Sequence, residues 1–159
     1  RFLVSTGFVS IYFLVVALRY TSGSLVSGRS VKSFGRKLLT VFAAFLTGAF
    51  VISYTYLPNL WLSMALAFLG CLFGGMRYTA STSLTLEQVP GFRGTMMSIN
   101  TAAISTGSAL GTGIGGLALL LFDYEGLGLS LGVMGIAAAI VVHLLVTDPT
   151  RTQSHDIVA

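Results

Sequence analysis

Five long apolar runs dominate the sequence and restrict what the chain can fold into. They cover residues 2–27, 38–57, 60–83, 95–121 and 127–146, and short polar connections separate them. Each is near or above the ~20 residues that a helix needs to cross ~30 Å of hydrocarbon. Because backbone amides in hydrocarbon must be paired within the segment, and no period-2 alternation recurs, each run is predicted to be a helix. We therefore expect an all-α integral membrane protein with five transmembrane helices.

The composition agrees with this fold class. Only 9% of the 159 residues are charged and the mean hydropathy is +0.87, whereas an average soluble domain is about 25% charged. The net charge of +4 could suggest nucleic acid as a partner. However, the positive charge lies in one loop and at helix ends rather than on one face, so a nucleic-acid partner is not expected. The expected surroundings are a lipid bilayer.

The stretch from residue 28 to 37 sets the expected orientation. It holds four of the nine basic residues and no acid, and we expect a loop with a tight turn at each of its two glycines. Short basic loops stay on the cytoplasmic side. The residues concerned are Gly28, Arg29, Lys32, Gly35, Arg36 and Lys37.

Counting loops from this side places the polar tail, residues 147–159, in the cytoplasm. It places Arg1 outside, which predicts at least one further helix upstream. The expected location is the cell membrane, with several crossings.

Glycines recur every four residues in the fourth run, at Gly107, Gly111 and Gly115, with Gly116 adjacent. Such a stripe lets another helix approach closely. Two interpretations stay open: ordinary packing of small residues, or a smooth face along which helices rock during alternating access.

Several segments together resemble the major facilitator superfamily of secondary transporters. Gly28, Gly35, Arg36 and Lys37 resemble the basic signature loop between the second and third helices of each half, although Lys32 stands where that signature has Asp. The segment 75–78, with Arg77, is similar to the fourth helix of a half. The Glu…Pro…Arg-Gly loop is matched by residues 87–94, and the glycine-rich antiporter signature by residues 107–116, with Thr112 in place of Pro.

The resemblance implies that the chain is helices two to six of a six-helix half. The degraded signatures favour the C-terminal half, with the N-terminal half of the same polypeptide as a missing partner. The implied function is secondary active transport of a small solute by alternating access. The resemblance favours efflux by antiport over uptake, and proton coupling is left open. The alternative is a non-transporting five-helix membrane scaffold or assembly protein.

Three polar residues within the runs are candidates for a substrate cavity: Arg19, Arg77 and Asn100. Arg19 lies about 13 Å before Gly28 along a helix, close to the bilayer centre, where a charge is costly. Two interpretations of Arg19 stay open: its side chain binds an anionic or polar group of the solute, or it extends along the helix to reach the membrane interface. Arg77 lines the cavity, or it pairs with carbonyl groups of a neighbouring helix. Asn100 contributes to the cavity, or it makes an ordinary interhelical hydrogen bond.

Glu87 and Arg93 flank the next inner loop and complete the expected cytoplasmic gate. We predict that Glu87 pairs with Arg36 or Arg29 when the gate is closed, because a carboxylate–guanidinium pair can break as helices separate. The alternative is a solvated interfacial charge of little energetic consequence.

Chemistry other than transport is not expected. The two histidines and one cysteine lie on separate segments, so no metal site or cofactor is predicted. No nucleophile–base spacing, phosphate loop or embedded acid pair is present in the sequence, and we expect no enzyme activity.

Overall fold

The computed structural model describes residues 5–147, and these form an all-α bundle, as predicted. The helices are α1 (Thr6–Phe34), α2 (Arg36–Tyr56), α3 (Leu60–Gln88) and α4 (Arg93–Leu145), with a short 3-10 helix, η1 (Pro90–Phe92), before α4. All four long helices are long and apolar enough to cross a membrane. Many large apolar side chains on them are exposed, which suits a bundle surrounded by lipid.

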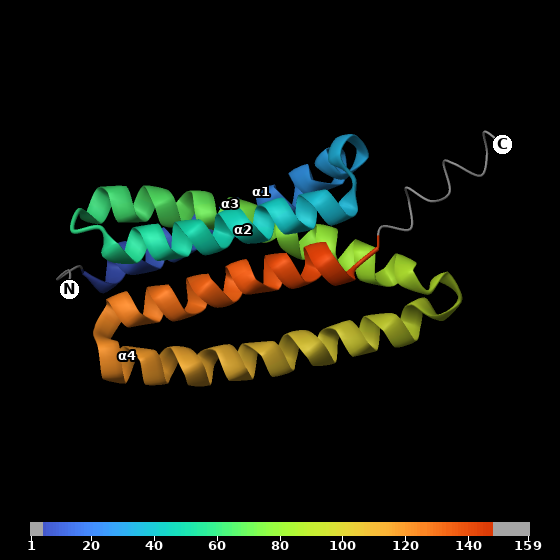
Figure 1. Ribbon diagram of the computed structural model, residues 1–159. Helices are drawn as coiled ribbons and strands as arrows, with labels where there is room; N and C mark the ends of the chain where they lie inside the picture. Colours follow the sequence, from blue (N-terminus) through green and yellow to red (C-terminus); the bar gives the residue numbers. More distant parts are fainter. Residues whose placement is uncertain (1–4, 148–159) are drawn as a thin grey trace.

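Four long helices are labelled where five were predicted, because α4 covers two helical segments that meet at a sharp break. Phe122 (φ −135°, ψ 16°) and Asp123 (φ 56°, ψ −159°) are the non-helical residues within α4. The chain reverses there, so that α4 forms a hairpin of two arms, residues 93–121 and 124–145 (Figure 1). The predicted reversal is present, but the loop expected over residues 122–126 is reduced to two residues.

The basic stretch from residue 28 to 37 is largely helical, which corrects the expected loop. Gly28 lies inside α1, and only Gly35, with φ 78°, interrupts the helix. That conformation is strained for any residue with a Cβ, so the turn falls at this glycine. The expected loop from Glu87 to Arg93 is likewise shorter, because α3 continues to Gln88.

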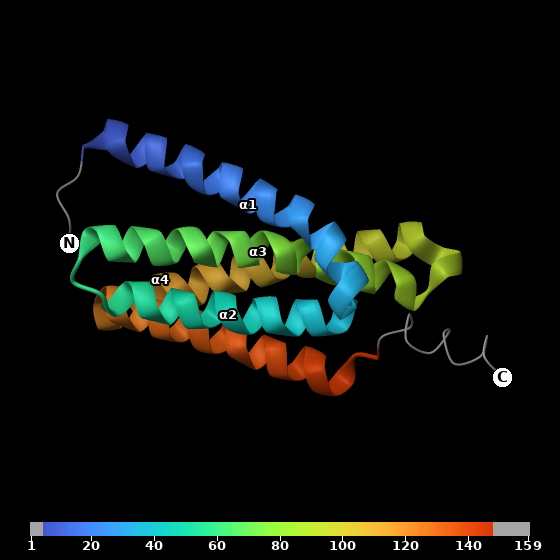
Figure 2. The same cartoon turned by 90° about the horizontal axis from the view of Figure 1, so that it is seen from above.

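The helices form two layers. The helix α3 lies between α1 and α2, and α4 lies behind them (Figure 2). The second arm of α4 packs on α2, where Gly132 faces Gly48. A small core of Leu39, Ala43, Met76 and Ala80 joins α2 to α3.

The contact between α1 and α3 depends on the absence of side chains. A Cβ added to Gly23 would overlap the carbonyl group of Leu72, and one added to Gly75 would overlap that of Tyr20. Hydroxyl groups add to this contact: Ser24 and Thr79 lie 2.5 Å apart (Oγ to Oγ1), and Ser27 Oγ donates to the carbonyl oxygen of Met76 at 3.1 Å. These helices are therefore held by close backbone approach and by polar contacts, as is usual in lipid.

Gly23 and Gly28 provide a matched pair for testing this contact. We expect Gly23→Ala to lower the free energy of unfolding by about 1–3 kcal/mol, because the new methyl group meets backbone rather than a flexible side chain. Gly28→Ala, in the same helix, meets nothing within 4 Å and is expected to raise it by roughly 0.5–1 kcal/mol. Denaturation of the detergent-solubilised full-length protein measures both, and equal effects would contradict the close contact.

Candidate functional site: a polar cavity and an interhelical ion pair

A polar cavity of about 240 Å³ lies where α2, α3 and both arms of α4 meet. Arg77 and Asn100, two of the three predicted cavity residues, line it from α3 and from the first arm of α4. Side chains with hydroxyl groups supply much of the remaining wall. The other lining residues are Thr40, Ala44, Tyr78, Ser81, Thr82, Ile104, Ala138 and Val142.

Asn100 carries an unsatisfied donor. Its Nδ2 atom is buried and has no hydrogen-bond partner in the described part of the chain. A buried amide N–H without an acceptor costs about 1–3 kcal/mol, and nearly all such groups in folded proteins are paired. Since Arg77 adds donors and no acceptor, an occupant of this cavity that carries hydrogen-bond acceptors would satisfy both residues.

The structure does not bring Arg19 into this cavity. Arg19 lies on α1, and its guanidinium carbon stands 4.3 Å from the centroid of the Phe68 ring on α3. A cation over an aromatic face is stabilised, most of all away from water. Phe68 thus offers Arg19 a partner that sequence reasoning did not foresee, and a role in solute binding stays a prediction.

Arg36 and Glu87 form the predicted ion pair, through Arg36 Nη1 and Glu87 Oε2. Arg36 is the first residue of α2, and Glu87 lies in the last turn of α3. Each charge is at the unfavourable end of its helix, since helix N-termini favour anions and C-termini favour cations. The helix dipoles therefore explain neither position, and the pair accounts for both.

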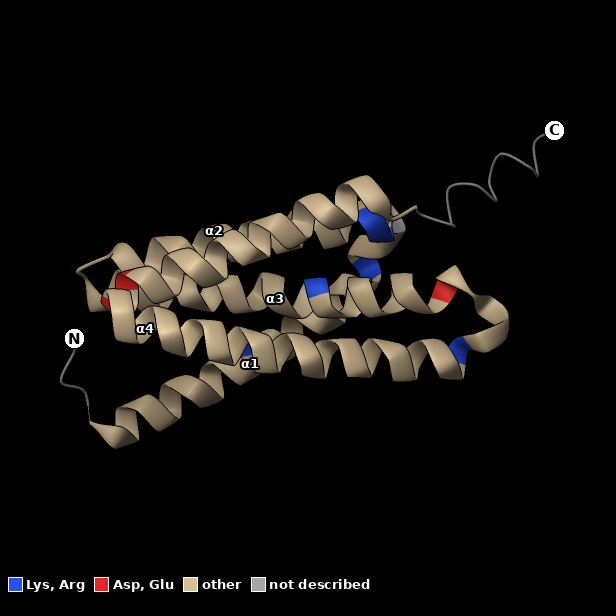
Figure 3. Cartoon of the chain, turned by 60° about the horizontal axis from the view of Figure 1, so that its bottom comes forward, with Lys and Arg blue, Asp and Glu red and all other residues tan. Residues whose placement is uncertain are grey.

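The other predicted gate residues are at the same end of the bundle. Gly28, Arg29 and Lys32 are in the last turns of α1, Gly35 is the break, Lys37 is in the first turn of α2, and Arg93 begins α4. Figure 3 shows basic residues where α1 meets α2 and where α4 begins, and acidic residues both at the end of α3 and near the break in α4. The predicted topology, with the basic end in the cytoplasm, stays a prediction.

Sequence reasoning missed a second link at the basic end. Gln88 Nε2 donates to the carbonyl oxygen of Thr147 at 3.0 Å, joining the end of α3 to the end of α4. No motif indicates this contact, because a lone glutamine at a helix end has many alternative partners.

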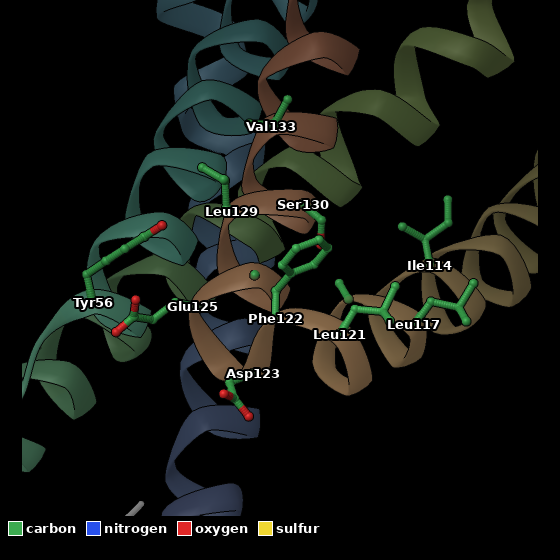
Figure 4. A pocket seen from close by; sticks show the side chains of 12 residues that line it. Tyr56, Ile114, Leu117, Leu121, Phe122, Asp123, Glu125, Leu129, Ser130 and Val133 are labelled. Carbon is green, nitrogen blue, oxygen red and sulfur yellow. The ribbon is translucent and has the colours of Figure 1, made fainter.

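A larger, mostly apolar pocket of about 820 Å³ lies between the two arms of α4 near the break. In Figure 4, Ile114 and Leu117 on the first arm and Leu129 and Val133 on the second face this space, with Phe122 between them. Asp123 and Glu125 also line it and supply its carboxylates. This pocket has no arginine or amide side chain among its lining residues.

The predicted glycine stripe is only partly used for packing within the described residues. A Cβ at Gly115 would come within 3.1 Å of Leu127 in the second arm, whereas Cβ atoms at Gly107, Gly111 and Gly116 would meet nothing within 4 Å. Among the described residues, no group of three metal-ligating side chains comes together.

Taken together, these features define a multi-pass helical membrane protein with an open cavity, lined by several polar side chains, where α2, α3 and α4 meet. The family profile of the Major Facilitator Superfamily matches residues 2–157, so the chain belongs to that superfamily of transporters. Over 103 residues it is 30% identical to the "Uncharacterized MFS-type transporter YceJ" of Bacillus subtilis (strain 168), covering 65% of this chain and 26% of that protein. The chain thus spans about a quarter of the length of this relative. No solved structure matches the chain.

The ion pair predicts a specific pattern of stability. The side chains of Arg36 and Glu87 are 22% and 28% exposed, so we expect a coupling energy of about 1 kcal/mol, reduced by salt. Arg36→Glu and Glu87→Arg should each destabilise the protein, whereas the two together should restore stability or exceed it, because each charge then suits its helix end. Thermal unfolding in detergent measures this cycle.

Arg29→Glu is the control for this cycle, since Arg29 is an exposed cation near the same end of the bundle. Additive losses in the double variant would show that Arg36 and Glu87 do not interact.

Proposed function

We propose that the complete protein moves a small solute across the cell membrane by alternating access. Membership of the major facilitator superfamily supports transport in general. The observation that carries the proposal is the polar cavity, in which the buried Nδ2 of Asn100 lacks an acceptor and Arg77 adds a charged donor. A solute with acceptor atoms would satisfy both groups for part of the cycle and leave them on release.

The Arg36–Glu87 pair supports alternation between two states. It joins α2 to α3 at the basic end, which we propose faces the cytoplasm, and the Gln88–Thr147 contact joins α3 to α4 nearby. Contacts of this kind hold the end closed and break when helices separate. We propose that Arg29, Lys32, Lys37 and Arg93 belong to the same gate.

The open glycine face of α4 supports a larger assembly. Gly107, Gly111 and Gly116 present a small-residue surface that no residue among positions 5–147 covers, and such surfaces in membranes receive other helices. We propose that helices of the N-terminal half of the same polypeptide cover this surface and complete the cavity wall. If transport is coupled to protons, as in efflux by antiport, the titrating carboxylate belongs to that half. We infer no enzyme activity.

Substitutions in the cavity test the proposed solute site. We expect Asn100→Leu and Arg77→Gln each to reduce transport at least tenfold, because the first removes an amide donor and the second removes the positive charge that the proposed solute would contact. Asn100→Leu should not destabilise the protein, since it removes an unsatisfied amide. The measurement is solute flux in vesicles containing the full-length protein, screened over a panel of small solutes.

Thr106→Val is the matched control on the same helix arm, because the Thr106 hydroxyl donates to its own helix at Ala102 and does not line the cavity. Flux unchanged by both cavity variants would exclude this site. Arg19→Gln tests Arg19 separately, and unchanged flux would remove it from the solute path.

Accessibility labelling tests the orientation. In a background without other cysteines, including Cys71→Ser, we expect Ser33→Cys to be protected from a membrane-impermeant maleimide in intact cells. We expect Glu125→Cys, near the break in α4, to be labelled, because the basic end faces the cytoplasm. Both positions are exposed in the bundle, so burial does not explain a difference. Labelling of both from one side would contradict the topology.

A further inference from the structure

The polar cavity is lined by hydrogen-bonding groups from α3 and α4 and, for the most part elsewhere, by hydrocarbon groups. Arg77 and Ser81 are four residues apart on α3, so they lie one turn apart on the same side of that helix, and Thr82 follows Ser81. Asn100 adds an amide from the first arm of α4. The hydrocarbon side chains that line the cavity are Ala44, Ile104, Ala138 and Val142.

The hydroxyl groups of the cavity differ in whether they are already used. The Thr40 hydroxyl donates to the carbonyl oxygen of Arg36 in its own helix at 2.8 Å. The hydroxyl groups of Ser81 and Thr82 make no hydrogen bond within residues 5–147. A hydroxyl group can donate as well as accept, so both can join Asn100 Nδ2 in donating to one bound group.

The cavity carries an uncompensated positive charge among the described residues. Three carboxylates fall within residues 5–147, and none of them lines the cavity. Glu87 pairs with Arg36 and lies ten residues beyond Arg77, about 15 Å along α3. Asp123 and Glu125 line the pocket at the break in α4 instead. The Arg77 side chain is exposed in the bundle, so its guanidinium is accessible to a molecule in the cavity.

These features select among the molecules that carry acceptors. A guanidinium presents paired N–H groups that match the two oxygens of a carboxylate, and such charge-assisted bonds are about twice as strong as neutral ones. One carboxylate balances the single charge of Arg77, whereas a phosphate monoester, with a charge of about −1.5 to −2 at pH 7, would exceed it. The volume of about 240 Å³ is below the ~300–1,000 Å³ of most ligand pockets, which favours a small molecule.

We propose that the solute is a small monocarboxylate with a short apolar chain. Its carboxylate would contact Arg77 and Asn100, and its chain would lie against Ala138 and Val142. Because an unpaired charge is costly within a membrane span, the anion and Arg77 would each offset the cost of the other. This inference rests on the proposed function, in which the polar cavity is the solute site.

Binding of acids and of their amides by the full-length protein in detergent tests the proposal. The probes are acetate, propionate, butyrate and hexanoate, each paired with its primary amide, at pH 8 and with ionic strength matched by sodium chloride. Acid and amide have nearly the same shape and share a carbonyl acceptor, so a preference reports the charge. A ligand that binds the folded state raises the unfolding temperature. We expect at least one acid to bind roughly tenfold more tightly than its amide.

Variants at the cavity separate this site from binding of anions elsewhere. Arg77→Gln should weaken binding of the acid roughly tenfold, to the level of the amide, and Arg77→Lys should keep a preference for the acid because it keeps the charge. Asn100→Leu should weaken binding of acid and amide alike, since it removes a neutral donor. Thr106→Val, outside the cavity, should change neither. The unfolding temperature without ligand confirms that each variant is folded.

The result that overturns this inference differs from the one that overturns the proposed function. Equal binding of acid and amide, binding of no acid in the series, or a preference that survives Arg77→Gln would each exclude the carboxylate site. The solute cavity itself would stand in those cases if Asn100→Leu still reduced solute flux. Flux unchanged by the cavity variants would instead exclude the cavity as the solute site.

Discussion

The close backbone approach of α1 to α3 and of α2 to α4 is the contact on which the bundle depends. In lipid no hydrophobic force draws apolar helices together, so they associate through tight packing and polar contacts. Gly23 and Gly75 allow the first approach, and Gly48 and Gly132 allow the second. The polar cavity lies between α2, α3 and the two arms of α4, so it depends on the second approach.

The helices were predictable from the sequence because hydrocarbon leaves the backbone no alternative. Their ends were not, because hydropathy marks the edge of the membrane rather than the end of a helix. The apolar span of α1 ends at Val31, yet the helix continues to Phe34. The position of the break in α4 was predicted correctly, but its length was not. The break is short because Asp123 takes a positive φ, which no local pattern indicated.

The sequence indicated which polar residues lie within the apolar runs, but not which side of its helix each of them faces. Arg19, Arg77 and Asn100 stood out because polar groups are costly in apolar runs. Which side of a helix each residue faces is set by packing, and hydropathy carries little information about it. Arg77 and Asn100 therefore meet at one cavity, whereas Arg19 lies over Phe68. The Gln88–Thr147 contact depends on two helix ends that are distant in sequence and could not be foreseen.

The modest strength of the Arg36–Glu87 pair suits the proposed gate, in which this contact would form and break. Breaking a fully buried pair by removing one partner costs about 3–5 kcal/mol, so a gate built on such a pair would rarely open without help. The side chains here keep 22% and 28% of their surface exposed, and water can solvate both charges as they part. A contribution of about 1 kcal/mol changes the ratio of closed to open states roughly fivefold. A shift of that size biases the equilibrium toward closure and still leaves the open state populated.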